Sequence, residues 1–340
     1  MTPLITIGIP IYNVENYIEE ALLSALNQSY PNIEILLVDD KGNDCSMQLV
    51  KRIIQNHPRK KYIKILRHQK NEGLSCARNT IIKNAKGEFL YFMDSDDYIT
   101  NDCIQLLYST MESNPVDFVE ASYCTINKNK LQIISSHQHT DYLIQDDISI
   151  YNHLYKNNIL KNNEITYTAW NKLFNLQFLK EKHINFIPHI YYEDRPFTLL
   201  IYLKGTSCRL ISNITYYYRK RTDSIMHIGI EKYTEKEIKD YIFQIEWKKN
   251  IAFEYKKEPF AELIIQETMI EAIFSAFYYL KKEQYIEING IRPFIRQLVS
   301  YPYTIPDIKY FNKYKYEHLK YWMFSKLPYW LQKSYLKKMK

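Results

Sequence analysis

The chain has 340 residues, which is long enough to bury a substantial core and favours two domains, or one large domain with an extension. A hydrophobic content of 46% excludes an intrinsically disordered chain. The net charge of +7 is concentrated in residues 309–340, which carry nine lysines and one acid, so the rest of the chain is close to neutral. A nucleic-acid-binding domain carries positive charge on its folded body, and no nucleic-acid partner is therefore expected.

The cysteines and the N-terminal pattern bear on the compartment. Five widely spaced cysteines without a CxxC pair predict a reducing cytosol, with neither a zinc site nor a disulfide framework. The sequence starts with an apolar strand pattern and not with a basic segment followed by a long apolar one, so no secretory signal is expected. No run of about 18 apolar residues is present, so no membrane-spanning segment is expected.

The first 117 residues alternate short apolar strand patterns with helical patterns. Strands are predicted at 4–10, 33–39, 62–67 and 88–93, and helices at 15–27, 45–56 and 74–85. Strands that are apolar on both faces and alternate with helices indicate a mainly parallel sheet covered by helices, an α/β fold.

After residue 117 the alternation stops. The stretches "VDFVEASYCTI" and "KLQIISS" predict strands of mixed or antiparallel pairing. A helix at 148–156, a polar loop at 157–164, a helix to residue 204 and a strand at 213–221 follow. From residue 231 the pattern is helical. We predict one domain at 1–228, in two parts (1–117 and 118–228), and a helical region with a basic aromatic tail at 229–340.

Acidic residues mark the end of the strand at 88–93, in the stretch "FLYFMDSDDYIT". Asp94, Asp96 and Asp97 offer hard oxygen ligands to a divalent cation, and such cations bridge carboxylates to substrate phosphates. The structural alternative is that Asp97 and Thr100 cap the helix that follows. Because ligands bind beyond the carboxyl ends of parallel strands, Asp39 at the end of the second strand is expected at the same edge.

Two further motifs predict contacts with charged groups. In "NEGLSCARN", Gly73 permits a tight turn, and Arg78 follows one helical turn after the anion-attracting helix start. The alternative for Arg78 is an exposed helix arginine. Glu193 and Asp194 precede Pro196 at a helix start, a placement that any helix favours. An ionised carboxylate there could also accept a proton from a hydroxyl nucleophile.

Together these blocks resemble glycosyltransferase family 2, the inverting nucleotide-sugar enzymes of GT-A fold. The resemblance rests on "ITIGIPIYNVENYIEEALLSALNQSYPNIEILLVDD", "NEGLSCARN", "KGEFLYFMDSDD", "WNKLF" and "YEDRPF", and covers residues 4 to about 224. It implies that residues 1–228 are the catalytic domain, with a nucleotide-sugar half (1–117) and an acceptor half (118–228). The implied nucleotide pocket consists of Pro10, Tyr12, Glu15, Asp39, Arg78 and Asp94, in which Asp39 would hold the edge of the base, usually uracil, and Arg78 would meet the diphosphate.

The resemblance also implies the chemistry. Asp96 would be the main ligand of Mn²⁺ or Mg²⁺, with Asp94 and His227 as candidate further ligands. Asp194 would be the catalytic base. Asp97, Glu193 and Trp170 would shape the donor-sugar and acceptor site, and Arg219 or Arg221, with Ser224, would approach the diphosphate.

The implied function is an inverting, metal-dependent transfer of a hexosyl or N-acetylhexosaminyl group from a UDP-linked sugar to a saccharide or lipid-linked saccharide, in bacterial surface polysaccharide synthesis. The alternatives are a polyprenyl-phosphate glycosyltransferase and a non-catalytic nucleotide-sugar-binding module. A cytoplasmic protein, peripheral at the inner face of the cytoplasmic membrane, is expected. Lysines interleaved with aromatic residues in the tail predict an anionic membrane surface as partner, or a lysine-rich helical cap.

Overall fold

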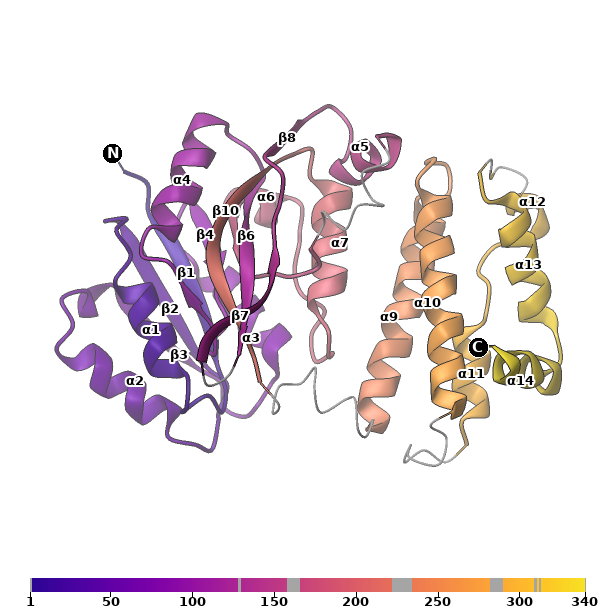
Figure 1. Ribbon diagram of the computed structural model, residues 1–340, viewed down its shortest axis with the longest axis horizontal. Coiled ribbons are helices and arrows are strands. Elements are labelled where there is room, and N and C mark those ends of the chain that lie inside the picture. Colours follow the sequence, from indigo (N-terminus) through magenta and orange to yellow (C-terminus); the bar gives the residue numbers. More distant parts are fainter. Residues whose placement is uncertain are drawn as a thin grey trace. The chain divides into compact units, whose positions relative to one another are not determined.

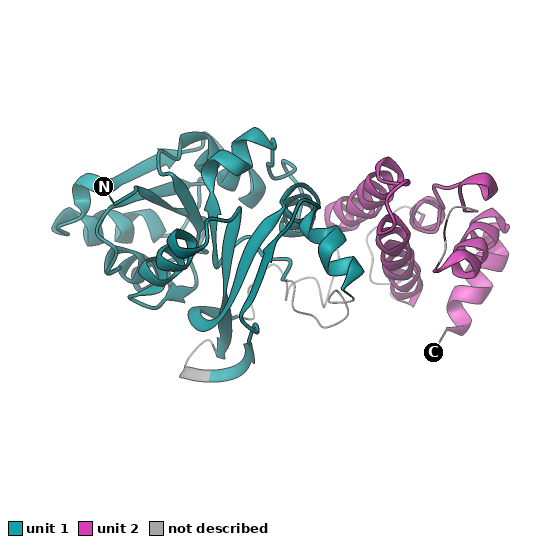
Figure 2. Cartoon of the chain, turned by 90° about the horizontal axis from the view of Figure 1, so that it is seen from above, with its two compact units in different colours: residues 1–221 teal, residues 222–340 magenta. Residues whose placement is uncertain are grey.

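The computed structural model describes residues 2–127, 130–157, 166–221, 234–281, 290–308, 311 and 313–339. The chain divides into two compact units, Met1–Arg221 (unit 1) and Thr222–Lys340 (unit 2), shown in teal and magenta in Figure 2. Each unit has its own hydrophobic core. The boundary that the sequence predicts near residue 228 lies between residues 222 and 233, outside the described residues.

A single sheet forms the centre of unit 1 (Figure 1). Its strands within the described residues are β1 (Ile5–Ile11), β2 (Ile33–Asp39), β3 (Ile63–Arg67), β4 (Phe89–Phe92), β5 (Tyr98–Ile99), β6 (Phe118–Asn127), β7 (Lys130–His137), β8 (Tyr142–Gln145), β9 (Lys172–Asn175) and β10 (Ser207–Lys220). The order is β3-β2-β1-β4-β9-β6-β10-β5, with β7 on β6 and β8 on β10.

The half of the sheet built by the first four strands is parallel, as the sequence predicts. β1 pairs with both β2 and β4, and β2 pairs with β3. The register aligns Ile11 with Asp39 and Gly8 with Phe92, so the carboxyl ends of these strands lie at one edge. The chain leaves the sheet there at Asp39 and before Asp94.

The other half has mixed pairing, which confirms the prediction for the region after residue 117. β9 runs antiparallel to both β4 and β6, while β6 is parallel to β10. Because β9 is antiparallel to β4, with Leu173 opposite Tyr91, β9 begins at the edge where β4 ends. Residues just before Lys172 are thereby placed beside the loop after β4.

Helices cover both faces of this sheet. They are α1 (Ile18–Leu26), α2 (Ser46–Gln55), the 3-10 turn η1 (Lys60–Tyr62), α3 (Leu74–Asn84), α4 (Cys103–Ser113), α5 (Ile150–Lys156), α6 (Leu176–Glu181) and α7 (Asp194–Lys204). Buried side chains of α1, α2 and α4 share one core with alternate residues of β1, such as Ile7 and Ile9. On the other face α3 lies so close to β1 that a Cβ on Gly8 would be 2.3 Å from Ile81 Cγ2.

Unit 2 is helical, as predicted. Its described helices are α9 (Glu235–Glu254), α10 (Ala261–Lys281), α11 (Arg292–Leu298), α12 (Ile305–Ile308), α13 (Lys315–Lys326) and α14 (Tyr329–Lys338). α9 starts with a capping box in which Thr234 and Glu237 satisfy each other's backbone N–H groups. α10 packs against α9 and α14, and their apolar faces form the core.

α10 differs from the expectation that no segment could span a membrane. By length and composition it is apolar enough, with a mean hydropathy of 1.2 over its most apolar 18-residue stretch. Within the protein 44% of that stretch is buried. A core helix of a globular domain meets the same two criteria, so α10 alone is weak support for a membrane span.

Candidate active site

The predicted site residues of unit 1 gather at the edge where β1, β2 and β4 end. Asp39 is the last residue of β2, and Asp94 follows β4 by two positions. Trp170 precedes β9 by two positions, and Asp194 is the first residue of α7. The carboxyl-end edge of the sheet is where α/β folds of this kind bind ligands.

Arg78, from α3, lies at the centre of this group and is almost completely buried, with 1% of its side chain exposed. Its Nη2 donates to Asp94 Oδ1 at 2.7 Å, and its Nη1 donates to Glu193 Oε1 at 2.8 Å and also to Asp194 Oδ1. One guanidinium therefore joins the loop after β4 to the start of α7. This buried position differs from the exposed helix arginine of the alternative, and the contact of Arg78 with a diphosphate stays a prediction.

The loop before α3 explains how Arg78 is held in place. Gly73, with φ of 90°, and Glu72 donate backbone hydrogen bonds to the two carboxylate oxygens of Asp40 at 2.8 and 2.9 Å. His68 Nδ1 lies 2.6 Å from the same carboxylate. Asp40 thus fixes the first turn of α3, and Arg78 follows one turn later.

Glu193 and Asp194 have different environments although they are neighbours in the chain. Burial, and then the charge of Asp194, raise the pKa of Glu193 to about 8, against the opposing effect of Arg78. Burial also raises the pKa of Asp194, while Arg78 opposes the shift. The Asp194 side chain is 22% exposed and that of Glu193 is 8% exposed. Glu193 therefore holds a proton more tightly than an ordinary glutamate, and Asp194 is the more accessible of the two carboxyl groups.

Asp96 faces Arg221, whose Nε lies 2.7 Å from Asp96 Oδ2. Burial raises the pKa of Asp96, and the charge of Arg221 opposes that shift. Arg219 has a different position, because its Nε donates to the backbone oxygen of Asp96 at 3.0 Å and its Nη2 pairs with Glu20. The two candidate arginines therefore have different contacts. Arg221 pairs with the side chain of Asp96, a candidate metal ligand, and Arg219 binds the backbone of the same loop.

Asp97 points into the protein and not toward the edge of the sheet. Its Oδ2 accepts from Tyr216 Oη at 2.7 Å and its Oδ1 accepts from the backbone N–H of Arg219 at 2.7 Å. Only 1% of Asp97 is exposed, and burial raises the pKa of its carboxyl group well above the usual range. Its predicted place beside the donor sugar differs from this inward position. The capping alternative is not seen either, since Asp102 is the N-cap residue of α4.

Trp170 belongs to an aromatic stack. Its ring lies 4.4 Å from that of Tyr216 and 5.7 Å from that of Tyr218, nearly parallel to both, and Tyr123 packs edge-on at 4.8 Å. The next residue, Asn171, has φ of 60° and donates to Ala121 O at 2.7 Å, which fixes the turn into β9. The indole is thus held by three tyrosine rings and lies beside the loop that contains Asp94.

The predicted nucleotide-pocket residues line the ends of β1 and β2. Pro10 is buried in β1 opposite Val38, whereas Tyr12, just after β1, is 45% exposed. Asp39 Oδ1 accepts from the backbone N–H of Lys41 at 3.1 Å. Glu15 Oε2 accepts from the backbone N–H of Cys45 at 2.8 Å, and α1 begins only at Ile18, later than predicted.

The metal prediction stays open to test. In the part of the chain that the structure describes, no group of three or more His, Cys, Asp or Glu side chains is placed to hold an ion. Asp94 and Asp96 contribute two carboxylates, paired with Arg78 and Arg221. The remaining candidates, Ser224 and His227, lie outside the described residues.

A cavity of about 380 Å³ lies at the opposite edge of the sheet, away from these residues. It is lined by Pro3, Glu88, Phe89, Tyr108, Met111, Glu112, Pro115, Val116, Asp117, Asn175 and Ser207. The strands β4, β6 and β10 start there, so the cavity belongs to the amino-end edge of those strands. It contains none of the predicted site residues.

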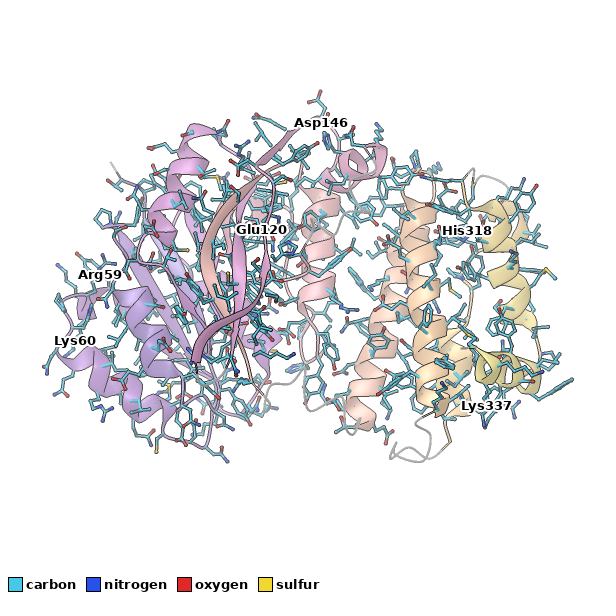
Figure 3. All side chains as sticks on the ribbon, viewed as in Figure 1. Arg59, Lys60, Glu120, Asp146, His318 and Lys337 are labelled. Atoms are coloured by element: carbon cyan, nitrogen blue, oxygen red, sulfur yellow. The ribbon has the colours of Figure 1, made fainter. Side chains whose placement is uncertain are left out.

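Sequence reasoning missed a buried ion pair behind Trp170. Glu120 of β6 and Lys172 of β9 are directly opposite each other in the sheet, with Lys172 Nζ 3.1 Å from Glu120 Oε1. Glu120 is labelled in Figure 3, inside unit 1. The available signal was that Glu120 and Lys172 stand inside the otherwise apolar stretches "VDFVEASY" and "WNKLF". Because a charge is buried only when it is paired, two charges in buried strands indicate an ion pair.

Comparison with known proteins adds the family. Residues 6–181 match Glycosyl transferase family 2. Glycosyltransferase GlyA of Streptococcus pneumoniae serotype 4 is 31% identical over 67% of this chain and 32% of its own length. Poly(ribitol-phosphate) beta-glucosyltransferase of Bacillus spizizenii is 34% identical over 64% of this chain and 32% of its own length. The chain thus spans about a third of these two relatives.

The glycosyltransferase EpsJ of Bacillus subtilis, itself uncharacterized, is 28% identical over 67% of this chain and 64% of its own length. Among solved structures, Staphylococcus aureus TarS 1-349 in complex with UDP-GlcNAc has a TM-score of 0.64 at 20% identity and covers 94% of this chain and 90% of that one. That likeness confirms the predicted fold. The family match covers more than half of the chain, which therefore belongs to glycosyl transferase family 2.

Proposed function

We propose that this chain transfers a sugar from a UDP-linked donor to a hydroxyl of a saccharide acceptor with inversion at the anomeric carbon. The observation that carries the proposal is the shared guanidinium of Arg78, which holds the candidate base Asp194 beside Asp94 of the predicted donor site. Binding of UDP-GlcNAc by the similar TarS supports a nucleotide-sugar donor of the hexosyl or N-acetylhexosaminyl type.

Asp194 is suited to the role of base by its position. Asp194 is the first residue of α7, where the helix dipole favours the ionised carboxylate, and its side chain is partly exposed. In the proposed step Asp194 takes the proton of the acceptor hydroxyl while that oxygen attacks the anomeric carbon. The bond from this carbon to the diphosphate oxygen breaks in the same step. The nucleoside diphosphate leaves with the electron pair, and no covalent enzyme intermediate forms.

The carboxylates of Asp94 and Asp96 would hold Mn²⁺ or Mg²⁺. Carboxylate oxygens are the ligands such ions prefer, and the raised pKa of Asp96 marks a site where a nearby positive charge is favourable. A bound ion supplies positive charge to the leaving diphosphate. Arg221, which pairs with Asp96, stands where it could contribute a charge-assisted hydrogen bond to the same group.

The pathway is proposed from the relatives. The similar poly(ribitol-phosphate) beta-glucosyltransferase of B. spizizenii and the complex of TarS with UDP-GlcNAc support a role in bacterial surface polysaccharide synthesis, on a saccharide or lipid-linked saccharide acceptor. A cytoplasmic protein at the inner face of the membrane suits such an acceptor. The competing functions remain a polyprenyl-phosphate glycosyltransferase and a non-catalytic nucleotide-sugar-binding module.

An anionic membrane surface is the partner proposed for α13 and α14. Tyr316, Leu319 and Met323 are spaced three and four residues apart on α13, and 77%, 37% and 56% of their surfaces are exposed. His318, labelled in Figure 3, is buried and faces α10 through a 3.1 Å contact with the Glu262 carbonyl oxygen. Apolar and aromatic side chains among lysines suit the headgroup region of anionic lipids.

Co-sedimentation with vesicles tests the membrane partner. Binding to phosphatidylglycerol vesicles, and not to phosphatidylcholine vesicles, should weaken in the triple variant Lys320→Gln, Lys326→Gln, Lys337→Gln. The matched control removes three exposed lysines of unit 1, Lys51, Lys61 and Lys70, and should still bind. Equal losses of vesicle binding in both variants would show that net charge alone, and not the surface of α13 and α14, causes the binding.

A two-stage experiment tests the activity. Thermal-shift screening against UDP-sugars with Mn²⁺ should find a stabilising donor, and that donor should then support transfer to a saccharide acceptor by the wild-type protein. Donor binding without transfer to any saccharide or polyprenyl phosphate would favour the non-catalytic module. Transfer to polyprenyl phosphate alone would favour the first alternative.

A further inference from the structure

Tyr17 lies in the loop between β1 and α1 and has no part in the proposed transfer step. Its backbone N–H donates to the Val14 carbonyl oxygen at 2.9 Å, which closes the turn that leads into α1. Tyr17 is the N-cap residue of α1, but its side chain makes no capping hydrogen bond. Only 5% of the residue is exposed. A large ring is thus buried at the start of the helix for a reason other than capping.

Two guanidinium groups lie over the ring of Tyr17. The Cζ atoms of Arg219 and Arg221 are 5.4 and 5.3 Å from the centroid of the ring. Cations within about 6 Å of a ring centroid are attracted to the face of the ring, and the attraction is stronger where water is excluded. Arg219 belongs to the end of β10 and Arg221 follows directly after it. The contact therefore joins the loop after the first strand to the end of β10.

The hydroxyl group of Tyr17 contributes little to holding the side chain. Tyr17 Oη is buried and has no hydrogen-bond partner among the groups that the structure describes. A buried hydroxyl without a partner is unfavourable, because it loses its hydrogen bonds to water. The ring, and not the hydroxyl, therefore provides the favourable contacts of Tyr17.

The two arginines differ in their other contacts. Arg219 Nη2 pairs with Glu20, and its Nε donates to the backbone oxygen of Asp96 at 3.0 Å. Arg221 Nε lies 2.7 Å from Asp96 Oδ2, an oxygen that is also a proposed ligand of the divalent ion. Such an ion binds oxygen ligands and would compete with Arg221 for this carboxylate, but not for the face of an aromatic ring. Tyr17 can therefore hold Arg221 whether or not Asp96 binds an ion.

We infer that Tyr17 is a positioning residue for Arg221 and, through this guanidinium, for the diphosphate of the donor. The inference rests on the proposed function, in which Arg221 is placed to donate to the leaving diphosphate. A long side chain that is not held in one conformation must be ordered when the ligand binds, and this ordering weakens binding. The ring of Tyr17 provides that order in advance. Because Tyr17 does not touch the donor in this scheme, its effect depends on Arg221.

Two substitutions separate the ring of Tyr17 from its hydroxyl. Tyr17→Leu should weaken the binding of UDP in the presence of Mn²⁺ about tenfold in isothermal titration, as expected on loss of a buried cation–π contact. Tyr17→Phe keeps the ring and should bind UDP nearly as well as the wild type. KM for the nucleotide sugar should change in parallel with the Kd for UDP. Equal affinity for UDP in Tyr17→Leu and the wild type would overturn the inference.

Uridine distinguishes the positioning of Arg221 from a general disturbance of the nucleotide pocket. It has the base and the ribose of UDP but no phosphate. Tyr17→Leu should therefore leave the binding of uridine, measured by ligand-observed NMR, unchanged. Equal losses of affinity for UDP and uridine would show that Tyr17 supports the pocket as a whole, and would overturn the inference.

A double-mutant cycle with Arg221→Gln tests the path of the effect. If the ring acts through Arg221, Tyr17→Leu should cause little further loss of UDP affinity once Arg221 has been replaced. A second loss of about tenfold in the double variant would mean that the two residues act independently, and would also overturn the inference.

Tyr30→Leu is the matched control for stability. Tyr30 is 1% exposed, its Oη donates to the Pro3 carbonyl oxygen at 2.8 Å, and its ring lies 5.1 Å from that of Tyr108, which lines the cavity at the opposite edge of the sheet. Its replacement should lower the Tm and leave the Kd for UDP unchanged. If Tyr30→Leu weakened UDP binding as much as Tyr17→Leu, reduced stability would explain both losses and the inference would fail.

Limited digestion by trypsin gives a readout that needs neither nucleotide nor transfer. Trypsin must bind the guanidinium of the residue before the cleaved bond. Cleavage after Arg221, followed by mass spectrometry, should be faster in Tyr17→Leu than in the wild type, and unchanged in Tyr17→Phe and Tyr30→Leu. Unchanged cleavage in Tyr17→Leu would refute the contact. If the wild-type protein binds UDP without transferring a sugar, the proposed function fails, whereas the UDP titrations and the digestion still test Tyr17.

Discussion

Arg78 and Asp194 are 116 positions apart in the sequence, yet the guanidinium of the first is in direct ion-pair contact with the carboxylate of the second. The same guanidinium binds Asp94 and Glu193. This one guanidinium therefore links the loop after β4 to the start of α7 through ion pairs. The consequences of changing any of these residues follow from this arrangement.

Replacing Arg78 should damage both stability and activity. Arg78→Met leaves three carboxyl groups around an apolar side chain, and removal of one partner from a buried ion pair costs about 3–5 kcal/mol. Arg78→Lys keeps the charge but loses the planar fork that reaches carboxylates in two directions. It should be folded and have a strongly reduced kcat. Urea unfolding and a transfer assay measure the two effects, and a fully active lysine variant would contradict this role.

Asp194→Asn should abolish transfer while donor binding survives. The amide cannot take a proton, and loss of a positioned general base costs about a hundredfold to ten-thousandfold in rate. Isothermal titration with UDP should give a nearly unchanged Kd, since Asp194 touches the acceptor in the proposed step. Wild-type rates in this variant would remove Asp194 from the mechanism.

Glu193→Gln should change the pH dependence of stability. The carboxyl group of Glu193 has a pKa of about 8 in the folded protein against an ordinary value of 4.5, so the folded state holds the proton more tightly. The contribution of this group to the free energy of unfolding is complete below pH 4.5 and is lost as pH rises to about 8.

Glutamine resembles the protonated acid, so the variant should lack this decline and retain most of its transfer activity. Urea unfolding at a series of pH values from 5 to 9 measures the difference from wild type. Parallel curves for the two proteins would show that Glu193 does not hold a proton in the folded state.

Asp96→Asn tests the metal site. With one of the two carboxylates neutral, stabilisation of the protein by Mn²⁺ plus UDP in a thermal-shift assay should disappear, and transfer should fall. Asp97→Asn is the matched control, because the carboxyl group of Asp97 is buried against Tyr216. Asp97→Asn should change the Tm of the protein more than it changes the stabilisation by Mn²⁺ plus UDP. Normal transfer by chelator-treated wild type would exclude the metal role.

The parallel half of the fold could be predicted from the sequence because its signals are local. The strand at Ile33–Asp39 was predicted with the bounds that the structure has, since seven consecutive residues are suited to a strand covered on both faces. The first helix was predicted to start at residue 15, yet α1 starts at Ile18. The backbone N–H groups of Val14 and Glu15 bind Ser46 and Asp44 near the start of α2, which no local pattern reveals.

The site could be predicted only in part, for a related reason. The family motifs identify which residues gather at the edge of the sheet, but not which way each carboxylate points. Asp97 turns inward because Tyr216 and the Arg219 N–H, about 120 residues later, provide its hydrogen bonds. The partners of Arg78 and Lys172 likewise come from distant segments. Burial of a charge depends on such partners, and spacing along the chain does not encode them.

The antiparallel course of β9 has a consequence for how the site tolerates substitution. β9 joins β4 to β6 through backbone pairing, which depends little on side-chain identity. The turn of Trp170 and Asn171 lies just before that pairing begins, and these side chains are 6% and 2% exposed. The course of the strand is thus insensitive to sequence, whereas the turn beside it depends on the side chains of these two residues.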